Sequence, residues 1–193
     1  MKPVELLAIL HTAEKLKDTT RHCDTSGGRR ESVAEHSWRL ALMAFFLRDE
    51  FPELDMDKVI QMCLVHDLGE CFTGDIPSFL KTDADTEKED ALLARWVAAL
   101  PAPYNADLHA LYAEMDALET AEAKLYKALD KLEAVIQHNE APLSTWLPRE
   151  YALNLTYADE NVAFSPYLTA LREAVRDETT AKIAAHGGMP AAE

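Results

Sequence analysis

The sequence predicts an all-α protein folded as one compact domain, and three observations lead to this expectation. Apolar residues recur at helical spacing in nearly every periodic segment, and no segment shows the alternation typical of a half-buried strand. The proline-containing breaks Phe51-Pro52 and Pro101-Ala102-Pro103 fall between these segments rather than inside them. With 193 residues, of which 48% are hydrophobic, the chain is long enough to bury a substantial core.

Two of the expected helices carry histidines. The first begins at the capping box Ser32–Glu35, whose side chains pair with free backbone N–H groups at the helix start. This start places His36 in the first turns of a helix so apolar that most of it must be buried. The second helix opens at Asp55 or Asp57 and carries the pair His66-Asp67 at the end of an apolar run.

The remaining elements follow from the same spacing and break signals. The glycines Gly69 and Gly74 bracket a turn that closes with Asp75-Ile76-Pro77. Apolar residues at helical spacing make residues 117–138 the clearest long helix. Further helices are expected at 3–17, 87–100, 104–114 and 165–185, a loop at 18–31, an exposed acidic segment at 78–88, a mixed segment at 139–163 and a disordered tail at 186–193.

Charge and cysteine content limit the possible partners. The net charge of −15 argues against a nucleic-acid surface and against anionic membranes, but a few local cations could still serve a small phosphorylated molecule. No stretch predicts a targeting or membrane-spanning segment. The cysteines Cys23, Cys63 and Cys71 form no Cys-x-x-Cys motif, which predicts reduced thiols and a cytoplasmic protein.

The pair His66-Asp67 predicts a metal site, because buried titratable groups need a partner. Imidazole and carboxylate ligands suit Mn, Fe, Co, Ni or Zn. His36 is the candidate third ligand, from a neighbouring buried helix, and Asp130 is the candidate fourth. Two plainer interpretations remain open at this point. A single buried histidine is more often a hydrogen-bonded core residue, and Asp130 lies about 140° from the middle of its apolar stripe, as a solvated partner of Lys127 would.

The order His36, His66-Asp67, Asp130 resembles the H…HD…D signature of the HD superfamily of metal-dependent phosphohydrolases. The strings ESVAEHSWRLALMA, LVHDLGECFTGDIP and TAEAKLYKALDKLE are most similar to the HD-domain 5′-deoxynucleotidases. This resemblance implies a helical HD-domain bundle over residues 1–185, the ligand set His36, His66, Asp67 and Asp130, and a homodimer. Because only His109 lies between the HD pair and Asp130, one divalent metal ion is expected rather than two.

The resemblance also suggests the groups around the metal. Glu70 and Asp75 occupy acidic positions that can move protons or hold the substrate, with no assignment of acid and base between them. Arg21 takes the position of the phosphate-binding arginine, and a guanidinium fork suits phosphate oxygens. Many relatives carry a tryptophan just after this arginine. Here His22 follows instead and could stack on a base.

Arg29 and Arg30, in the same predicted loop as Arg21, are more simply interpreted as solvated charges. The expected activity is removal of the 5′-phosphate from deoxyribonucleoside monophosphates, with a nucleotide rather than a nucleic-acid polymer as the partner. Two alternatives remain: another HD phosphohydrolase, acting on a cyclic nucleotide or other small phosphoester, or a non-catalytic HD module that binds a nucleotide.

Overall fold

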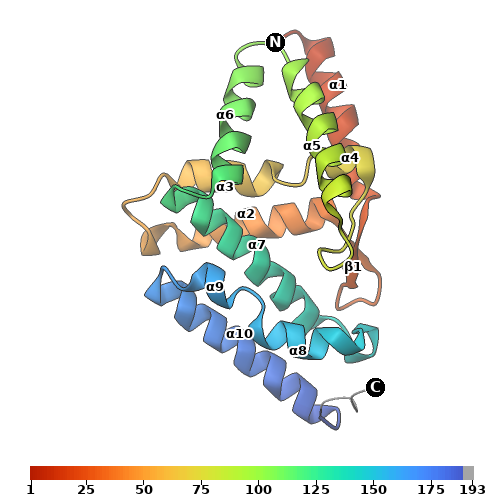
Figure 1. Cartoon of the computed structure of the whole chain (residues 1–193), viewed down its shortest axis with the longest axis vertical. Coiled ribbons are helices and arrows are strands. Elements are labelled where there is room, and N and C mark those ends of the chain that lie inside the picture. The colour runs from red at the N-terminus through yellow and green to blue at the C-terminus, as the bar shows by residue number, and fades with distance from the viewer. Residues whose placement is uncertain (189–193) are drawn as a thin grey trace.

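The computed structural model describes residues 1–188 as helices joined by short connections, which confirms the all-α prediction (Figure 1). The α-helices are α1 (Pro3–Ala13), α2 (Val33–Leu47), α3 (Met56–Val65), α4 (Glu70–Thr73), α5 (Asp83–Ala98), α6 (Tyr104–Ala117), α7 (Ala121–Glu140), α8 (Pro148–Thr156), α9 (Asp159–Val162) and α10 (Pro166–Ala185). Short 3-10 helices form η1 (Glu14–Lys17), η2 (Arg48–Glu50) and η3 (Leu143–Thr145), and the strands are β1 (Thr20–Asp24) and β2 (Arg30–Ser32).

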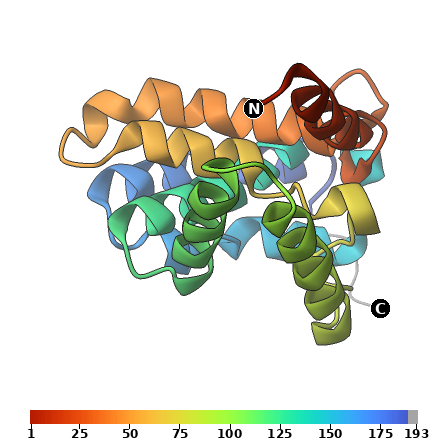
Figure 2. The same cartoon turned by 90° about the horizontal axis from the view of Figure 1, so that it is seen from above.

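Helix α7 is the central element of the fold. It packs against α3 and α2 on one side and against α10 and α9 on the other. Figure 1 shows α7 crossing the middle of the molecule between these two groups, and Figure 2 shows α2 and α3 side by side. The main core forms where they meet, from fully buried residues that include Leu40, Val59, Leu125, Leu129 and Leu168. A helix packed on two sides must be apolar on more than one face.

The expectation of a loop at residues 18–31 was wrong, because this segment forms an antiparallel hairpin of β1 and β2. Its turn is closed by hydrogen bonds between Thr25 N–H and the Arg29 carbonyl and between Gly28 N–H and the Thr25 carbonyl. Gly28 adopts a φ of 79°, which a glycine accepts without strain. The strands are short and mostly polar, so they lack the apolar alternation from which a strand is predicted.

Several helix ends also differ from the expectation. The first helix stops at Ala13 and continues as η1. Helix α5 begins at Asp83, four residues before the expected start at 87, because Thr82 and Asp85 form a capping box inside the acidic segment 78–88. Helix α7 begins at Ala121, after the cap residue Thr120. The mixed segment 139–163 contains η3, α8 and α9.

At the carboxyl end, α10 is followed by a turn in which the His186 ring lies 2.8 Å from the Lys182 carbonyl oxygen. This turn covers the first residues of the tail expected to be disordered, and the rest of that tail, 189–193, lies outside the described residues. Within residues 1–188, no helix is both long and apolar enough to cross a membrane.

Candidate metal centre and substrate cavity

The pair His66-Asp67 lies in the connection between α3 and α4. Helix α3 ends at Val65, two residues before Asp67, so the expectation that this helix carries the pair was wrong. The local fold orients the histidine: its Nδ1–H donates to the Cys63 carbonyl at 2.9 Å, and Tyr112 donates its hydroxyl to the Val65 carbonyl at 2.6 Å. The Nε2 atom of His66 is therefore the ring nitrogen left for another partner.

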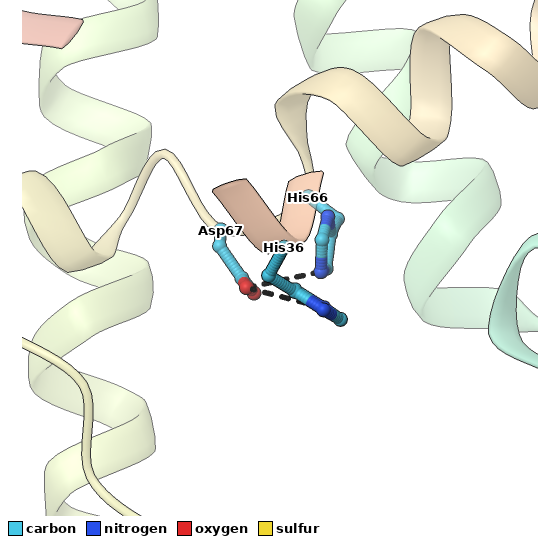
Figure 3. Close-up of side chains that lie close together, drawn as sticks. All are labelled: His36, His66 and Asp67. Carbon is cyan, nitrogen blue, oxygen red and sulfur yellow. Dashed lines mark ion pairs between the residues drawn. The ribbon is translucent and has the colours of Figure 1, made fainter. Parts of the chain in front are cut away.

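His36 reaches the same place from the first turn of α2. The predicted capping box is present, since Glu35 N–H donates to the Ser32 hydroxyl and Ser32 N–H donates to the Glu35 carboxylate. Figure 3 shows the side chains of His36, His66 and Asp67 converging, with Asp67 Oδ2 3.0 Å from His66 Nε2 and 4.0 Å from His36 Nε2. These three side chains are close enough to share one metal ion.

Asp130 joins this group from the middle of α7. Its Oδ1 lies 3.2 Å from His36 Nε2 and 3.7 Å from His66 Nε2, while Lys127 donates to its Oδ2 at 2.8 Å. The pairing with Lys127 was therefore correct, and the solvated position was wrong: only 16% of the Asp130 side chain is exposed. The side of α7 that carries Lys127 and Asp130 lines a polar cavity.

The atoms in this cluster fit a divalent cation. Because His66 Nδ1–H is committed to a carbonyl, the lone pair on Nε2 points toward the two carboxylates, and this buried atom has no hydrogen-bond partner among the described residues. Two imidazoles and two carboxylates are a donor set typical of first-row transition metals. Among protein groups alone, burial and Arg21 lower the pKa of His36, but hydrogen bonds to Asp130 and Glu133 outweigh them and raise it to about 10.

Glu70 and Asp75 line a cavity of about 280 Å³ that opens from this cluster. Glu70 is the first residue of α4 and is 7% exposed. Burial, followed by the charges of Asp67 and Asp75, raises its pKa to about 9. Burial also raises the pKa of Asp75, against the opposing charge of Arg21. Gly74, at a φ of 79°, makes the turn between α4 and Asp75.

Three cations line the same cavity: Arg21 from β1, Lys127 from α7 and Lys81 from the segment before α5. Arg21 places Nη1 3.7 Å from Asp67 Oδ2, beside the proposed metal ligands. Sequence reasoning singled out Arg21 but missed both lysines as cavity residues. Lys127 had a signal, because it precedes Asp130 by one helical turn.

The other arginines of the hairpin lie elsewhere. Arg29 pairs with Glu35, Arg30 lies 3.4 Å from Asp24, and both are more than half exposed. Their interpretation as solvated surface charges agrees with these positions. His109 is likewise exposed, on α6, and does not line the cavity.

His22 lines the cavity beside His138, which lies two helical turns beyond Asp130 on α7. Its Nε2 lies 2.9 Å from Oε1 of the buried Glu150, and its ring meets Phe79 edge-on at 5.6 Å between centroids. The carboxylate of Glu150 also caps α8, accepting the Leu147 N–H at 2.6 Å. Sequence reasoning missed Glu150, which has no recognisable motif around it.

The structure also contains two buried glutamates behind the cluster, Glu31 and Glu133, which sequence reasoning did not single out. Glu133 is fully buried and hydrogen-bonded to Nδ1 of His36. Its position three residues after Asp130 put it on the same side of the helix, which was the one available signal.

Comparison with known proteins agrees with this arrangement. The sequence matches the HD domain family over residues 13–172. A predicted metal-dependent phosphohydrolase from Magnetospirillum magnetotacticum is 30% identical, with a TM-score of 0.77 over 93% of this chain and 95% of that chain. A conserved hypothetical protein from Pyrococcus furiosus is 27% identical, with a TM-score of 0.67 over 89% and 98%.

Among curated proteins, the human 5′-deoxynucleotidase HDDC2 is 32% identical over 114 residues, which are 58% of this chain and 55% of the relative. The chain thus spans about half the length of the human and related curated proteins that it matches.

Proposed function

Because this chain belongs to the HD domain family, we propose that it is a metal-dependent 5′-deoxynucleotidase, which hydrolyses deoxyribonucleoside 5′-monophosphates to deoxyribonucleosides and phosphate. The observation that carries the proposal is the convergence of His36, His66-Asp67 and Asp130 at one end of a cavity lined by cations. The name 5′-deoxynucleotidase of the curated relatives supports the choice of substrate.

In this proposal His36, His66, Asp67 and Asp130 hold one divalent ion, drawn from Mn, Fe, Co, Ni and Zn. Such an ion supplies positive charge that stabilises the phosphoryl oxygens in the transition state and lowers the pKa of water. The protein fixes the ligand atoms in advance, because the local backbone orients His66 and the capping box sets the start of the His36 helix.

Arg21 and Lys127 bind the phosphate group. The Arg21 guanidinium is held by Glu31, with Nε 3.1 Å from Oε2, and its Nη1 reaches toward Asp67. A fork of N–H donors can grip two phosphate oxygens at once, and it keeps its charge at every physiological pH. These cations explain how a chain of net charge −15 can bind a dianionic substrate.

Glu70 and Asp75 move the protons. Hydrolysis requires one proton to leave the attacking water and one to reach the 5′ oxygen as the bond from phosphorus to that oxygen breaks. Both carboxyl groups line the cavity, and burial raises the pKa of each. The pKa of Glu70 rises to about 9, so Glu70 can hold a proton near neutral pH. A nearby divalent cation lowers both pKa values. This brings them closer to the pH range in which one carboxyl group can donate a proton while the other accepts one.

The nucleoside occupies the end lined by His22 and Phe79. His22 stands where many relatives carry a tryptophan, and its contact with Glu150 leaves a polar imidazole on the cavity wall. We therefore expect base and sugar preference to depend on this wall, whereas phosphate chemistry depends on the opposite end.

Three further properties belong to the proposal. Residues 1–185 act as one HD domain, two copies form a homodimer, and the protein works in the cytoplasm on nucleotides rather than on nucleic-acid polymers. The acidic net charge supports the last point, because polyanions require a basic surface. Light scattering of the purified protein tests the dimer.

The deciding experiment measures phosphate release across deoxyribonucleoside and ribonucleoside 5′-monophosphates, after chelation and after re-addition of single divalent ions. We expect release from the deoxyribonucleotides, loss on chelation and recovery with at least one transition metal. Turnover only on cyclic nucleotides or other phosphoesters would show that the proposed substrate class is wrong. Metal binding without any turnover would favour a nucleotide-binding module.

A further inference from the structure

Two glutamates are buried directly behind the groups proposed to bind metal and phosphate. Glu31 is 2% exposed and Glu133 is fully buried, and one oxygen of each lies within 4.8 Å of the other and of a His36 ring nitrogen. Burial of an ionised carboxylate is costly unless it is paired, so two adjacent ones call for a specific role. Neither glutamate lines the cavity, and therefore neither touches a substrate there.

Glu133 contacts the metal-cluster side. Its Oε2 is hydrogen-bonded to Nδ1 of His36, while Nε2 of the same ring faces Asp67 and Asp130. An ionised carboxylate can only accept, so Nδ1 carries a hydrogen in either charge state of the ring, and Nε2 is the nitrogen left to bind an ion. A carboxylate behind a histidine fixes the ring orientation and the tautomer of a metal ligand.

Glu31 contacts the phosphate side. Its Oε2 lies 3.1 Å from Nε of Arg21 and accepts the Cys23 thiol hydrogen at 3.1 Å. Arg21 in turn directs Nη1 toward the cavity end near Asp67. This ion pair places the carboxylate on the Nε side of the guanidinium, so the Nη donors on the other side remain available to an anion.

The surrounding charges argue against a second metal ion between these glutamates. Arg21 lies against Glu31, Arg39 places Nε 3.6 Å from Glu133 Oε1, and the His36 ring already occupies the other oxygen of Glu133. Cations of the protein itself thus supply the balancing charge. The glutamates are better suited to hold other side chains in place than to bind an ion.

We infer that Glu133 and Glu31 are positioning residues that divide the site between them: Glu133 holds the metal ligand His36 with its Nε2 lone pair toward the ion, and Glu31 holds Arg21 toward the phosphate. The role of Glu31 rests on the proposed function, whereas the role of Glu133 concerns metal binding alone. It therefore predicts that metal affinity and substrate affinity respond to different glutamates.

The test pairs substitutions that fill the same space. Glu133→Leu removes the acceptor for His36, and Glu133→Gln keeps one through its carbonyl oxygen. Glu31→Gln is the matched control, a substitution of the same kind at the neighbouring buried glutamate. Circular dichroism and thermal melting first establish which variants fold, and Glu133→Ala replaces the leucine variant if that one does not.

Titration of the metal-free proteins with Co²⁺ or Zn²⁺ gives the first readout, which requires no turnover. We expect Glu133→Leu to weaken metal binding about 10- to 100-fold, the range measured when carboxylates behind metal ligands are removed, and Glu133→Gln to recover most of it. Glu31→Gln should bind metal like the parent protein but raise KM for nucleotide. Wild-type metal affinity in Glu133→Leu, or equal losses in the leucine and glutamine variants, would overturn the assignment of Glu133.

The second readout is the ring ¹⁵N spectrum of His36 in the zinc-bound parent protein. We expect the hydrogen on Nδ1, and a hydrogen on Nε2 would contradict the inference even if no variant folds. Equal KM values in Glu31→Gln and the parent would remove the role of Glu31. If the parent protein hydrolyses no nucleotide, the proposed function fails, while the metal titrations still decide the role of Glu133.

Discussion

Asp130 Oδ1 lies 3.2 Å from Nε2 of His36, although the two residues are 94 positions apart in the sequence. The contact exists because α7 packs across α2 with its polar side toward the start of that helix. This crossing brings two motifs that are far apart in the sequence together as one set of proposed metal ligands. The proposed chemistry consequently depends on how α7 packs against α2.

Asp130→Ala should abolish tight metal binding and reduce phosphate release by more than about 100-fold, because one anionic ligand is lost. Elemental analysis after dialysis and the rate of phosphate release measure the two effects. Asp177→Ala, at an exposed position of α10, is the control and should change neither. Full metal occupancy in Asp130→Ala would show that this carboxylate is not a ligand.

Glu70→Gln should keep the metal and lose about 10²- to 10⁴-fold in kcat, the contribution of a positioned proton-transfer group. The neutral amide preserves the size of the side chain but cannot exchange a proton. Metal content by elemental analysis and kcat with a deoxyribonucleotide give the two values. Loss of the metal in this variant would make Glu70 a ligand instead.

Arg21→Lys should raise KM and lower kcat together, because one ammonium cannot reproduce the planar fork of the guanidinium. Metal affinity should stay unchanged, since the side chain is not among the proposed ligands. Arg30→Lys is the matched control on the same hairpin, at a half-exposed position. Unaltered kcat/KM in Arg21→Lys would remove this residue from phosphate binding.

His22→Trp should change the relative kcat/KM among nucleotides by about 10-fold, the scale of one altered contact in a binding pocket. The effect should appear as a changed preference among bases and sugars, with metal affinity retained. A panel of deoxyribonucleotides and ribonucleotides measures it. An equal change for every nucleotide would separate His22 from nucleoside selection.

Leu129→Ala should destabilise the protein by about 2–5 kcal/mol, because it opens a cavity in a fully buried part of α7. Urea denaturation monitored by circular dichroism measures the free energy of unfolding. Leu10→Ala on α1 is the comparison, since that side chain is 53% exposed and should cost far less. Similar losses for both substitutions would contradict the central role of α7.

The parts of the fold that were predicted correctly depend on local signals. The Ser32–Glu35 capping box and the proline breaks are read within a few residues, so the start of α2 and the helical class followed from them. The hairpin of β1 and β2 was missed because its strands are short and polar. Its stability comes from pairing and from its contacts with other elements, which no local pattern encodes.

The site shows the same division between local and non-local information. His66-Asp67 stands out against an apolar run, but Asp130 looked solvated because a helical wheel records spacing and not what packs on each face. Only the resemblance to a family placed Asp130 with the histidines. Glu31 and Glu133 had no chemistry-bearing motif, and their roles emerge from contacts with His36 and Arg21 alone.

The hairpin that carries Arg21 runs directly into α2, which carries His36. Near its turn it is fastened to α7, because Gln137 donates to the Asp24 carbonyl at 2.8 Å. Extra residues between Ser32 and His36 would displace the histidine, whereas extra residues in the exposed tip at 26–28 would leave it in place. A fluorescent label attached at that tip therefore leaves the chemical groups of the cavity intact.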